Sequence, residues 1–434
     1  MRIAVIGGGV SGLTAAYILS RRHEVTLFEA GDYIGGHTHT HRIEDPDGQP
    51  LHIDSGFIVF NDRAYPNFRR LLDRLEVECQ PSDMSFSMRC EESGLEYQGS
   101  SLNGLFAQRR NLLRPDFLRM VADIVRFYRQ GKRMLSGNGN GGLHANGNGS
   151  VQRKGASAAD MTTVGEFLRN HRYSSSFVRH HLLPVSAAIW SADPRRVRDM
   201  PIEFMLRFFH NHGMLDLSGR PQWRVIKGGS QRYVEKMIRP FSRGIRLNSP
   251  VVGVRRLARG VEVKTPDQEW EYFDQVVIGA HSDQALAMLR DADRAEREIL
   301  GSIAYQPNQA VLHTDRALLP RRRRAWASWN YHLMPRQEQS VALTYHMNRL
   351  QTLAAKRQYC VTLNRGDIDS ARILRRLVYQ HPVYTPQALR AQSRHADISG
   401  RRRTHYCGAY WGYGFHEDGV NSALRVCRAF GMEL

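Results

Sequence analysis

A glycine-rich stretch near the start of the chain carries the clearest chemical signal in the sequence. Residues 7–12 read Gly-Gly-Gly-Val-Ser-Gly and contain the spacing G-x-G-x-x-G. In such a loop Gly7 permits a tight turn, Gly9 lets a phosphate group approach the backbone, and Gly12 lets a helix pack closely on a strand. The spacing predicts a loop that holds the pyrophosphate of a dinucleotide.

The flanking residues have the patterns of the elements that must position this loop. Residues 2–6 form a short apolar run typical of a buried strand, and residues 13–20 are typical of a helix. A second strand is expected over residues 24–29, and it ends in Glu29, where a dinucleotide fold places an acid that binds a ribose. The helix N-terminus offers free N–H groups to phosphates. The alternative is a glycine-rich turn in another α/β unit, but strand, helix and acid together favour the dinucleotide site.

A second pair of glycines indicates which dinucleotide is bound. After Glu29 the chain continues through Gly35 and Gly36 to His37. This segment resembles the flavin amine oxidase and phytoene desaturase superfamily, in which a strand-ending glutamate is followed by a G-G-[R/K]-x-x motif. The resemblance implies that FAD is the cofactor, with Glu29 at the adenosine ribose and the glycine pair near the phosphates. His37 replaces the usual basic residue, although a neutral histidine can still donate a hydrogen bond.

Two segments far from the N-terminus resemble other parts of the same superfamily. Residues 223–230 are similar to the stretch that opens the second half of the FAD domain, and Val251 then matches a position whose backbone contacts adenine. Residues 406–423 resemble the last flavin-binding segment, in which a strand, a glycine turn and a helix face the pyrimidine side of the flavin. A helix dipole there would stabilise negative charge on a reduced flavin. The alternative for this segment is a surface loop followed by an amphipathic helix.

The resemblance implies one set of residues around a non-covalently bound FAD. They are Gly7, Gly9, Val10, Ser11, Gly12, Glu29, Ala30, Gly35, Gly36, His37, Thr38, Val251, Gly408, Ala409, Gly419 and Val420. No metal is expected, because no acid or cysteine accompanies His37 and His39 at ligand spacing. No catalytic group can be assigned. His281 and His416 are candidates for proton transfer, although a structural role is the simpler interpretation of each.

The residues around the substrate give a weaker signal. Many amine oxidases have a lysine near the reactive nitrogen of the flavin, and the corresponding strand here, residues 308–313, has Asn308 at that place. The asparagine disfavours an oxidase of that type. Several aromatic residues could line a pocket, although such residues more often pack in a core. They are Trp326, Trp329, Tyr331, Tyr410, Trp411 and Tyr413.

Four longer segments resemble one subgroup within this superfamily. Residues 59–68, 81–87, 326–331 and 414–419 look like one bacterial subgroup of NAD/FAD-binding oxidoreductases. Its members are similar to the N-terminal flavoprotein domain of plant cyclopropane fatty acid synthases. This resemblance implies an FAD-dependent oxidoreductase that acts on an apolar substrate such as a lipid acyl chain, with a methyltransferase like cyclopropane fatty acid synthase as a candidate partner. Two alternatives stay open: a flavin amine oxidase, and a flavin-containing accessory subunit of a lipid-modifying methyltransferase.

These motifs predict an α/β fold with two domains. The first is a Rossmann-like FAD-binding domain with a parallel sheet and a small antiparallel layer, and the second is a discontinuous substrate domain. The FAD-binding domain is expected to comprise residues 1–65, 220–290 and 400–434, and the substrate domain residues 66–219 and 291–399. The antiparallel layer is expected from strands at residues 245–254, 261–264 and 272–279. A Gly/Asn-rich insert at residues 136–150 is expected to be a flexible loop.

The chain is strongly basic, with a formal net charge of +19. No nucleic-acid motif is visible, so nucleic acid is not an expected partner. The remaining interpretations are contact with an anionic membrane and an arginine-rich surface without a specific partner. Residues 117–133 alternate apolar and basic residues at helical spacing. Such a helix either lies on an acidic lipid surface or, as we favour, packs on the core with a basic solvent face.

The cysteines and the hydropathy of the sequence indicate in which cellular compartment the protein is expected. The five cysteines are scattered without a C-x-x-C pair, which predicts free thiols in a reducing compartment. Met1 leads directly into the first expected strand, and no apolar run approaches the roughly twenty residues that a membrane-spanning helix needs. We therefore expect a cytoplasmic protein, with a peripheral location at the inner face of the membrane as a variant of that expectation.

Overall fold

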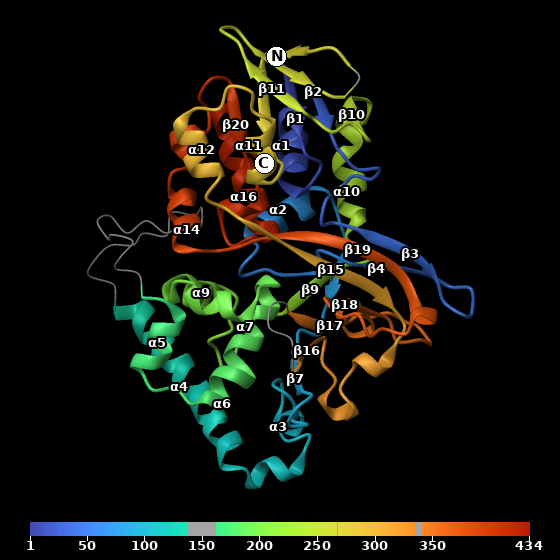
Figure 1. Ribbon diagram of the computed structural model, residues 1–434. Helices are drawn as coiled ribbons and strands as arrows, with labels where there is room; N and C mark the ends of the chain where they lie inside the picture. Colours follow the sequence, from blue (N-terminus) through green and yellow to red (C-terminus); the bar gives the residue numbers. More distant parts are fainter. Residues whose placement is uncertain (138–161, 267, 336–340) are drawn as a thin grey trace.

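The computed structural model describes residues 1–137, 162–266, 268–335 and 341–434. Residues 138–150 of the predicted insert therefore lie outside the described residues. In Figure 1 an α/β part containing both chain ends lies above a mainly helical part, and the long strands β15 (Tyr305–His313) and β19 (Ile373–Pro382) pass between them.

The centre of the upper part is a five-stranded sheet whose neighbouring strands are all parallel. In spatial order its strands are β10 (Ile245–Arg246), β2 (Glu24–Phe28), β1 (Arg2–Ile6), β14 (Gln275–Ile278) and β20 (Thr404–Tyr406). Residues 3–6 of β1 are all apolar and buried because both faces of this sheet are covered. The predicted parallel sheet is confirmed.

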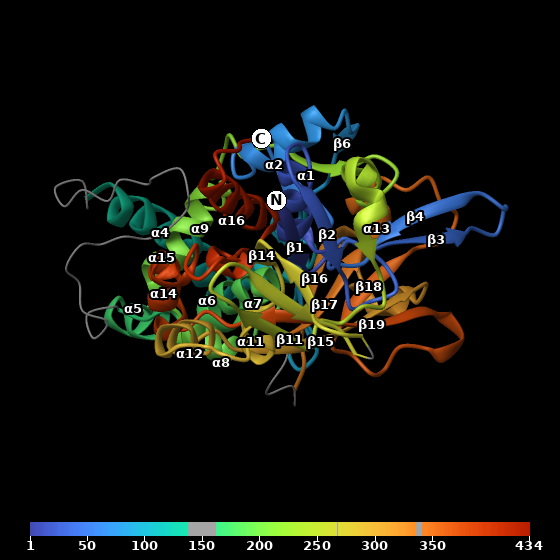
Figure 2. The same ribbon diagram turned by 90° about the horizontal axis from the view of Figure 1, so that it is seen from above.

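Alternate residues of β1 pack on opposite faces of the sheet. Ile3 and Val5 join a core with helices α1 (Val10–Leu19) and α16 (His416–Ala429). Ala4 and Ile6 join a second core with an antiparallel sheet of β11 (Gly253–Arg256), β12 (Val261–Lys264) and β13 (Glu271–Phe273). Figure 2 shows α1 and β11 on opposite sides of β1. The predicted small antiparallel layer is thus present.

Two of the predicted strands are wrong as single elements. The strand expected at residues 245–254 divides into β10 in the parallel sheet and β11 in the antiparallel sheet, because Asn248 has a left-handed φ of 49° and Pro250 follows it. The strand expected at residues 272–279 divides at Asp274 into β13 and β14. The carboxylate of Asp274 accepts a hydrogen bond from the Arg2 N–H at 2.7 Å, which anchors the corner between the sheets.

A seven-stranded sheet extends from β15 and β19, which lie between the two parts, down beside α7 in the lower part (Figure 1). Its order is β19, β15, β18 (Cys360–Leu363), β17 (Ala342–His346), β16 (Trp329–Leu333), β7 (Phe86–Cys90) and β8 (Glu96–Gln98). Two smaller sheets pair β3 (Thr40–Glu44) with β4 (Pro50–Asp54), and β9 (Trp223–Ile226) with β5 (Val59–Asn61) and β6 (Cys79–Pro81). The domain boundaries themselves stay a prediction, and β6 pairs with β9, a strand from the other predicted domain.

The remaining helices cover these sheets. In the lower part they are α3 (Leu102–Leu105), η1 (Arg109–Leu113), α4 (Pro115–Gly137), α5 (Val164–Asn170), α6 (Ser175–Phe177), η4 (Val178–Leu182), α7 (Leu183–Trp190), α8 (Pro194–Asp199) and α9 (Ile202–Asn211). The others are α2 (Pro66–Arg74), α10 (Gln231–Ile238), η5 (Arg239–Gly244), α11 (Ser282–Met288), α12 (Arg294–Leu300), η6 (Arg316–Leu318), η7 (Arg323–Ala325), α13 (Met347–Leu350), η8 (Ser370–Arg372), α14 (Pro386–Ser393), α15 (His395–Ile398) and η9 (Ala409–Trp411).

Helix α4 contains the amphipathic stretch at residues 117–133. Phe117 and Phe127 are buried in the main core, and Val121, Ile124 and Tyr128 are partly buried against it. The arginines and Lys132 on the other face are exposed. The packed-helix interpretation is confirmed, and the interpretation of this apolar stripe as a lipid-binding face is wrong because the core already covers it.

All five cysteines are free thiols, as expected from their spacing. Four of them are buried. Among the residues that the structure describes, no helix combines the length and the hydropathy that crossing a bilayer requires.

Candidate functional site

The glycine-rich loop joins β1 to α1. Gly7 has a φ of 102°, in the region that favours glycine. A Cβ on Gly12 would lie 1.9 Å from the carbonyl oxygen of Gly7, and a Cβ on Gly279 would lie 3.0 Å from the Cα of Gly12. These contacts confirm the predicted roles of Gly7 in the turn and of Gly12 in close packing.

The N-terminus of α1 has the properties of an anion site. Its capping residue is Gly9, no side chain caps the helix, and its first turn contains no acidic residue. The space next to Gly9 is open, because no atom lies within 4 Å of the place where a Cβ would stand. The first N–H groups of a helix have no partner within the helix and lie at the positive end of its dipole. This end of α1 therefore suits a phosphate group.

Glu29 lies at the end of β2, beside the glycine-rich loop. Its Oε2 accepts a hydrogen bond from the Gly8 N–H at 2.7 Å, and its Oε1 accepts one from the Gly31 N–H at 2.8 Å. Gly36 has a φ of 59°, and a Cβ there would lie 3.0 Å from the Cα of Gly9. The acid and the second glycine pair therefore meet at the loop, as the sequence predicts.

The other predicted cofactor residues lie around the same edge of the parallel sheet. The Ser249 N–H, two residues before Val251, donates to the carbonyl oxygen of Glu29 at 2.8 Å. Gly419 packs against Val10, because a Cβ on Gly419 would lie 2.6 Å from the Val10 Cγ1. The residues with accessible surface are Gly7, Gly9, Val10, Glu29, Ala30, Gly36, His37, Val251 and Ala409. Those that are buried are Ser11, Gly12, Gly35, Thr38, Gly408, Gly419 and Val420.

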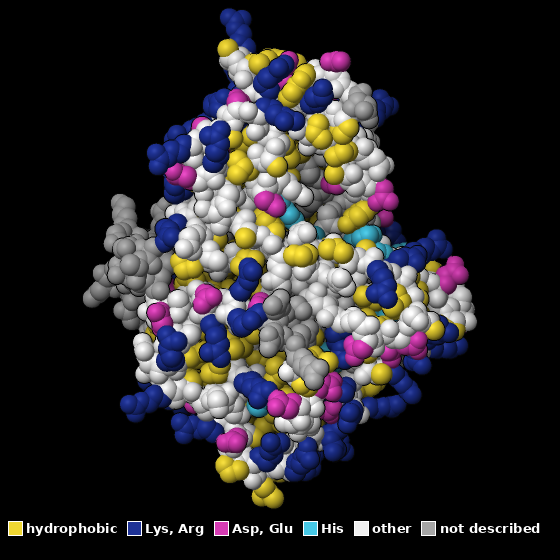
Figure 3. All heavy atoms as spheres, in the orientation of Figure 1, with side chains coloured by type: hydrophobic (Ala, Val, Ile, Leu, Met, Phe, Trp, Pro, Cys, Tyr) yellow, Lys and Arg dark blue, Asp and Glu magenta, His cyan; other side chains and the backbone are white. Residues whose placement is uncertain are grey.

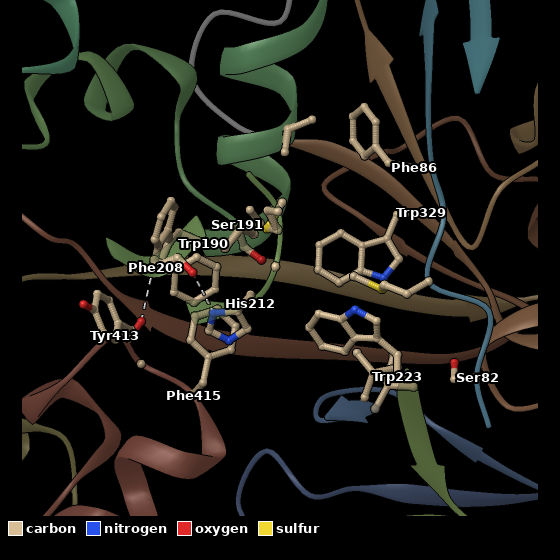
Figure 4. Close-up of a pocket in the computed structure, with 18 of the residues that line it drawn as sticks. Ser82, Phe86, Trp190, Ser191, Phe208, His212, Trp223, Trp329, Tyr413 and Phe415 are labelled. Carbon is tan, nitrogen blue, oxygen red and sulfur yellow. Dashed lines mark hydrogen bonds between the residues drawn. The ribbon is translucent and has the colours of Figure 1, made fainter. Parts of the chain in front are cut away.

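A cavity of about 470 Å³ extends from this region into the lower part of the molecule. Its wall is mainly aromatic, and Figure 4 shows rings that come from separate elements facing a common space. Labelled examples are Trp190, Phe208, Trp223, Trp329, Tyr413 and Phe415. The Trp190 indole N–H donates to the carbonyl oxygen of Tyr413 at 3.3 Å, so the polar atom of this ring is satisfied. The cavity therefore offers a long apolar surface to a substrate.

The sequence-based pocket residues are only partly correct. Trp329 and Tyr413 line the cavity. Tyr331 packs in the main core, Tyr410 and Trp411 pack in the core behind the parallel sheet, and the Trp326 indole N–H donates to the carbonyl oxygen of Pro320. These four residues do not line the cavity. They pack in a core or near the surface, which was the alternative interpretation of the aromatic residues.

The cavity wall has almost no formal charge. Among the described residues that line it there is no aspartate, glutamate or lysine, and Arg220 is the one arginine. Burial lowers the pKa of the lining histidines: to about 3 for His181 and His416, to about 4 for His212 and His381. These imidazoles are therefore neutral at pH 7.

Arg220 is an exposed residue whose side chain reaches the cavity beside Tyr128. Its Nε donates to the carbonyl oxygen of Asp216 at 2.8 Å. The carboxylate of Asp216 is engaged elsewhere, with Lys132 at 2.6 Å and Arg63 at 3.0 Å. In the described parts of the chain no carboxylate lies within ion-pair distance of Arg220. The guanidinium therefore keeps a full positive charge available to a ligand.

A cluster of histidines lies at the cavity wall around His37. The ring of His37 lies 5.3 Å from that of His381 and 6.3 Å from that of His281, between ring centroids. His416 stacks on Phe57 at 3.5 Å. Burial, together with the neighbouring histidines, holds the pKa of His37 well below its usual value. Of the two predicted proton-transfer candidates, His416 lines the cavity, whereas His281 is in the second layer and stacks on a tyrosine ring.

A chain of amide groups sets the protonation of His381. The Gln309 N–H donates to the Asn364 Oδ1, so the amide nitrogen of Asn364 donates to the Asn308 Oδ1 at 2.7 Å. The Asn308 Nδ2 must then donate to the His381 Nδ1, at 2.9 Å. A neutral His381 accepts this bond at Nδ1 and carries its hydrogen on Nε2. Asn308, at the place where we expected a lysine in amine oxidases, thus positions a histidine of the cavity.

Sequence patterns did not indicate Arg220, His381 or the tryptophans of α7 and β9 as site residues. They belong to elements far apart in the chain, and only Trp223 is part of a motif, the stretch at residues 223–230 that was assigned to the cofactor domain. One usable signal was present: residues 220–223 lie a few residues before the glycine pair at residues 228–229, so this segment was expected to return to the cofactor domain.

The sequence matches a family model described as flavin containing amine oxidoreductase over residues 10–370. A carotenoid phi-ring synthase of Streptomyces griseus is 27% identical over 289 residues, which are 64% of this chain and 52% of that protein. The chain spans about half the length of the curated relatives that it matches over most of its own length.

Solved structures share the fold over almost the whole chain. Cyclohexylamine oxidase from Brevibacterium oxydans superposes with a TM-score of 0.71 at 14% identity and covers 99% of this chain and 98% of that one. A fatty acid isomerase from P. acnes superposes with a TM-score of 0.68 at 17% identity and covers 98% of each chain. The match over residues 10–370, the parallel sheet and the loop at α1 confirm the predicted superfamily, fold class and FAD cofactor: this chain belongs to the family of flavin-containing amine oxidoreductases.

Proposed function

We propose that this protein is an FAD-dependent oxidoreductase whose substrate is an apolar chain with an anionic or uncharged head, such as a lipid acyl chain. The observation that carries the proposal is the cavity, which is lined by aromatic rings and neutral histidines, contains no acidic residue, and has its one full charge at Arg220. A carboxylate at Arg220 would form a charge-assisted hydrogen bond, while the attached chain would replace water along the aromatic wall.

The composition of the cavity argues against a cationic amine as substrate. No carboxylate lines the cavity to attract an ammonium group, and Arg220 would repel one. The cavity wall also contains no lysine. Among the related proteins, the names carotenoid phi-ring synthase and fatty acid isomerase refer to apolar compounds, whereas cyclohexylamine oxidase refers to an amine. The flavin amine oxidase is therefore our second candidate.

We place FAD along the carboxyl edge of the parallel sheet. The uncapped N-terminus of α1 would hold the pyrophosphate, Glu29 the adenosine ribose, and the backbone at Val251 the adenine. When bound, FAD accepts or donates a hydride. The protein would orient the substrate carbon, exclude water with the aromatic wall, and take up or supply a proton at one of the neutral imidazoles, of which His37 has no hydrogen bond among the described residues that fixes its tautomer.

Replacing Glu29 with glutamine is expected to raise the Kd for FAD about tenfold to a hundredfold, because one charge-assisted hydrogen bond contributes roughly 1.5–3 kcal/mol. The measurement is a titration of apoprotein with FAD, followed by flavin fluorescence. Glu24→Gln is the matched control, because Glu24 lies at the other end of the same strand and is exposed. Equal FAD affinity in all three proteins would remove Glu29 from the cofactor site.

The proposed function predicts that an unsaturated long-chain fatty acid changes the redox state of the flavin under anaerobic conditions, and that cyclohexylamine does not. An allylic C–H bond is the chemically easiest hydride source in such a chain. The absorbance of oxidised flavin is recorded after each compound is added to oxidised enzyme and, for the reverse direction, to dithionite-reduced enzyme. Bleaching by the amine alone would establish an amine oxidase instead.

The proposed function also includes a partner enzyme and a location for the protein. We infer that a lipid-modifying methyltransferase acts on the same acyl chains and that the protein reaches them at an anionic membrane. A flavin that responds to neither compound in either direction, in a protein that raises the turnover of such a methyltransferase when added to it, would support the accessory-subunit alternative.

A further inference from the structure

The lower end of the molecule carries a group of exposed leucines. Two of them, Leu102 and Leu113, expose 77% and 87% of their surface, which is unusual for side chains of this size. Leu112 and Leu118 are also exposed. All of them lie on α3, on η1 or at the start of α4, and in Figure 3 hydrophobic side chains protrude at this end of the molecule.

Arginines surround these leucines. Arg109, Arg110 and Arg114 belong to or follow η1, and residues 321–324 are four consecutive exposed arginines whose helix η7 contacts α3 and β8. The backbone N–H groups of Arg321 and Arg322 donate to the Glu96 carboxylate of β8, which holds this second run against the first. We call the leucines and arginines together the leucine–arginine tip.

The charge of the tip is largely unneutralised. Arg109 donates to the carbonyl oxygen of Phe106 and to the side chain of Asn103, which are neutral acceptors. None of the arginines of the tip is within ion-pair distance of a carboxylate in the part of the chain that the structure describes. Asp116, in the first turn of α4, is an acidic residue within the same segment. Exposed leucines beside unpaired arginines fit a surface that is apolar inside and anionic at its boundary.

The tip also adjoins the cavity. Gly99 and Ser100 line the cavity and directly precede the capping residue of α3, Ser101. Tyr128, on the same helix that begins at the tip, lines it as well and lies beside Arg220. An acyl chain leaving a bilayer at the tip would therefore have a short way to the aromatic wall.

We propose that the leucine–arginine tip is a docking surface for anionic lipid bilayers, with the leucines inserted at the level of the acyl chains and the arginines at the lipid phosphates. This docking proposal rests on the proposed function only in one respect: docking would deliver an acyl substrate to the cavity. The docking itself requires no redox turnover. It also replaces the stripe at residues 117–133, which the core covers, as the membrane-contacting element.

The test is co-sedimentation of the full-length, FAD-loaded protein with vesicles of phosphatidylcholine alone and of phosphatidylcholine mixed with phosphatidylglycerol. We expect binding to the mixed vesicles that weakens as salt is raised. Arg110→Gln combined with Arg324→Gln should weaken binding about 30-fold, because each arginine near an anionic surface contributes about 1 kcal/mol. Leu113→Gln should weaken it roughly tenfold, because a buried leucine contributes about 1.5–3 kcal/mol when fully covered and the insertion is partial.

Matched controls separate the tip from the general positive charge of the protein. Arg239→Gln combined with Arg243→Gln removes the same charge from exposed arginines of η5 in the upper part, and Leu257→Gln removes an exposed leucine there. Both controls should bind like the unchanged protein. Equal losses in tip and control variants, unchanged binding of Leu113→Gln, or no binding at low salt would overturn the proposal. Vesicle binding without any response of the flavin to fatty acids would overturn the proposed function and leave the docking surface standing.

Discussion

Replacing Arg220 with glutamine is expected to lower kcat/KM for a long-chain fatty acid about tenfold to a hundredfold, because the lost charge-assisted hydrogen bond is worth roughly 1.5–3 kcal/mol. Arg220 has the one full charge on the cavity wall, and its position is set by the bond from its Nε to the Asp216 carbonyl. The effect should fall mainly on KM, because the guanidinium would bind the carboxylate of the substrate in the ground state and in the transition state alike.

Three comparisons test whether Arg220 binds the carboxylate of the substrate. The methyl ester of the same fatty acid, which lacks the charge, should be turned over equally by both proteins. Arg220→Lys keeps the charge and should recover part of the loss. Arg224→Gln is the matched control, since Arg224 is four residues away, pairs with Asp62 and does not line the cavity. An equal loss for acid and ester would show that Arg220 maintains the loop and does not bind the carboxylate.

The cofactor region could be predicted from sequence because its requirements are local. The turn at Gly7, the close contact at Gly12 and the acid at the end of β2 all follow from a run of residues that forms one strand–turn–helix–strand unit. A φ of 102° strongly favours glycine, and a contact of 1.9 Å between a hypothetical Cβ and a backbone oxygen permits glycine alone. The residue type at each position therefore reports the local geometry.

The cavity could not be predicted in the same way. Trp190, Trp223 and Trp329 come from three elements that are brought together by tertiary packing. Only Trp329 was among the aromatic residues expected to line a pocket, and nothing in its neighbours distinguished it from Tyr331, which lies in the core. The same holds for α4, whose pattern fits both a lipid surface and a protein core, since apolar periodicity shows that a face is covered without showing what covers it.

Two strands were predicted wrongly at places where the chain passes from one sheet to another. Residues 245–254 and 272–279 are continuous β-type runs in sequence, yet each contributes to two sheets. The left-handed backbone at Asn248 and the hydrogen bond from Arg2 to Asp274 that mark these corners are single-residue features, which an average over a window of residues does not resolve.

Acidification from pH 7 to pH 5 is expected to lower the stability of the protein steeply. Burial lowers the pKa of many histidines to about 3 or 4, whereas the same groups in the unfolded chain titrate near 6.5. They include His41, His181, His212, His313, His332, His381, His395, His405 and His416. The unfolded state therefore binds more protons between pH 6.5 and pH 4, so stability is fully present above pH 6.5 and falls as the pH decreases.

The expected loss of folding stability at pH 5 is large enough to measure. At pH 5 each such histidine costs about 2 kcal/mol, so a few of them match the roughly 5–15 kcal/mol that stabilise a typical domain. Three carboxyl groups act in the opposite direction. Burial raises the pKa of Asp418 to about 7 and that of Asp54 to about 6, and it also raises the pKa of Glu417. Each of these groups costs stability while it is ionised in the folded protein and releases that cost as the pH falls. Three carboxyl groups cannot offset so many histidines.

The measurement is the free energy of unfolding by urea at a series of pH values between 8 and 5 on the FAD-loaded protein. His405→Phe should reduce the pH dependence, because it removes one titrating group while a ring is kept against Phe430, at 4.7 Å between ring centroids. The control is His171→Phe, because His171 is an exposed ring outside the cavity whose centroid lies 4.3 Å from that of Phe167. A stability that is constant from pH 7 to pH 5 would mean that these histidines take up protons in the folded state, and the neutral cavity wall on which the choice of substrate rests would then be charged.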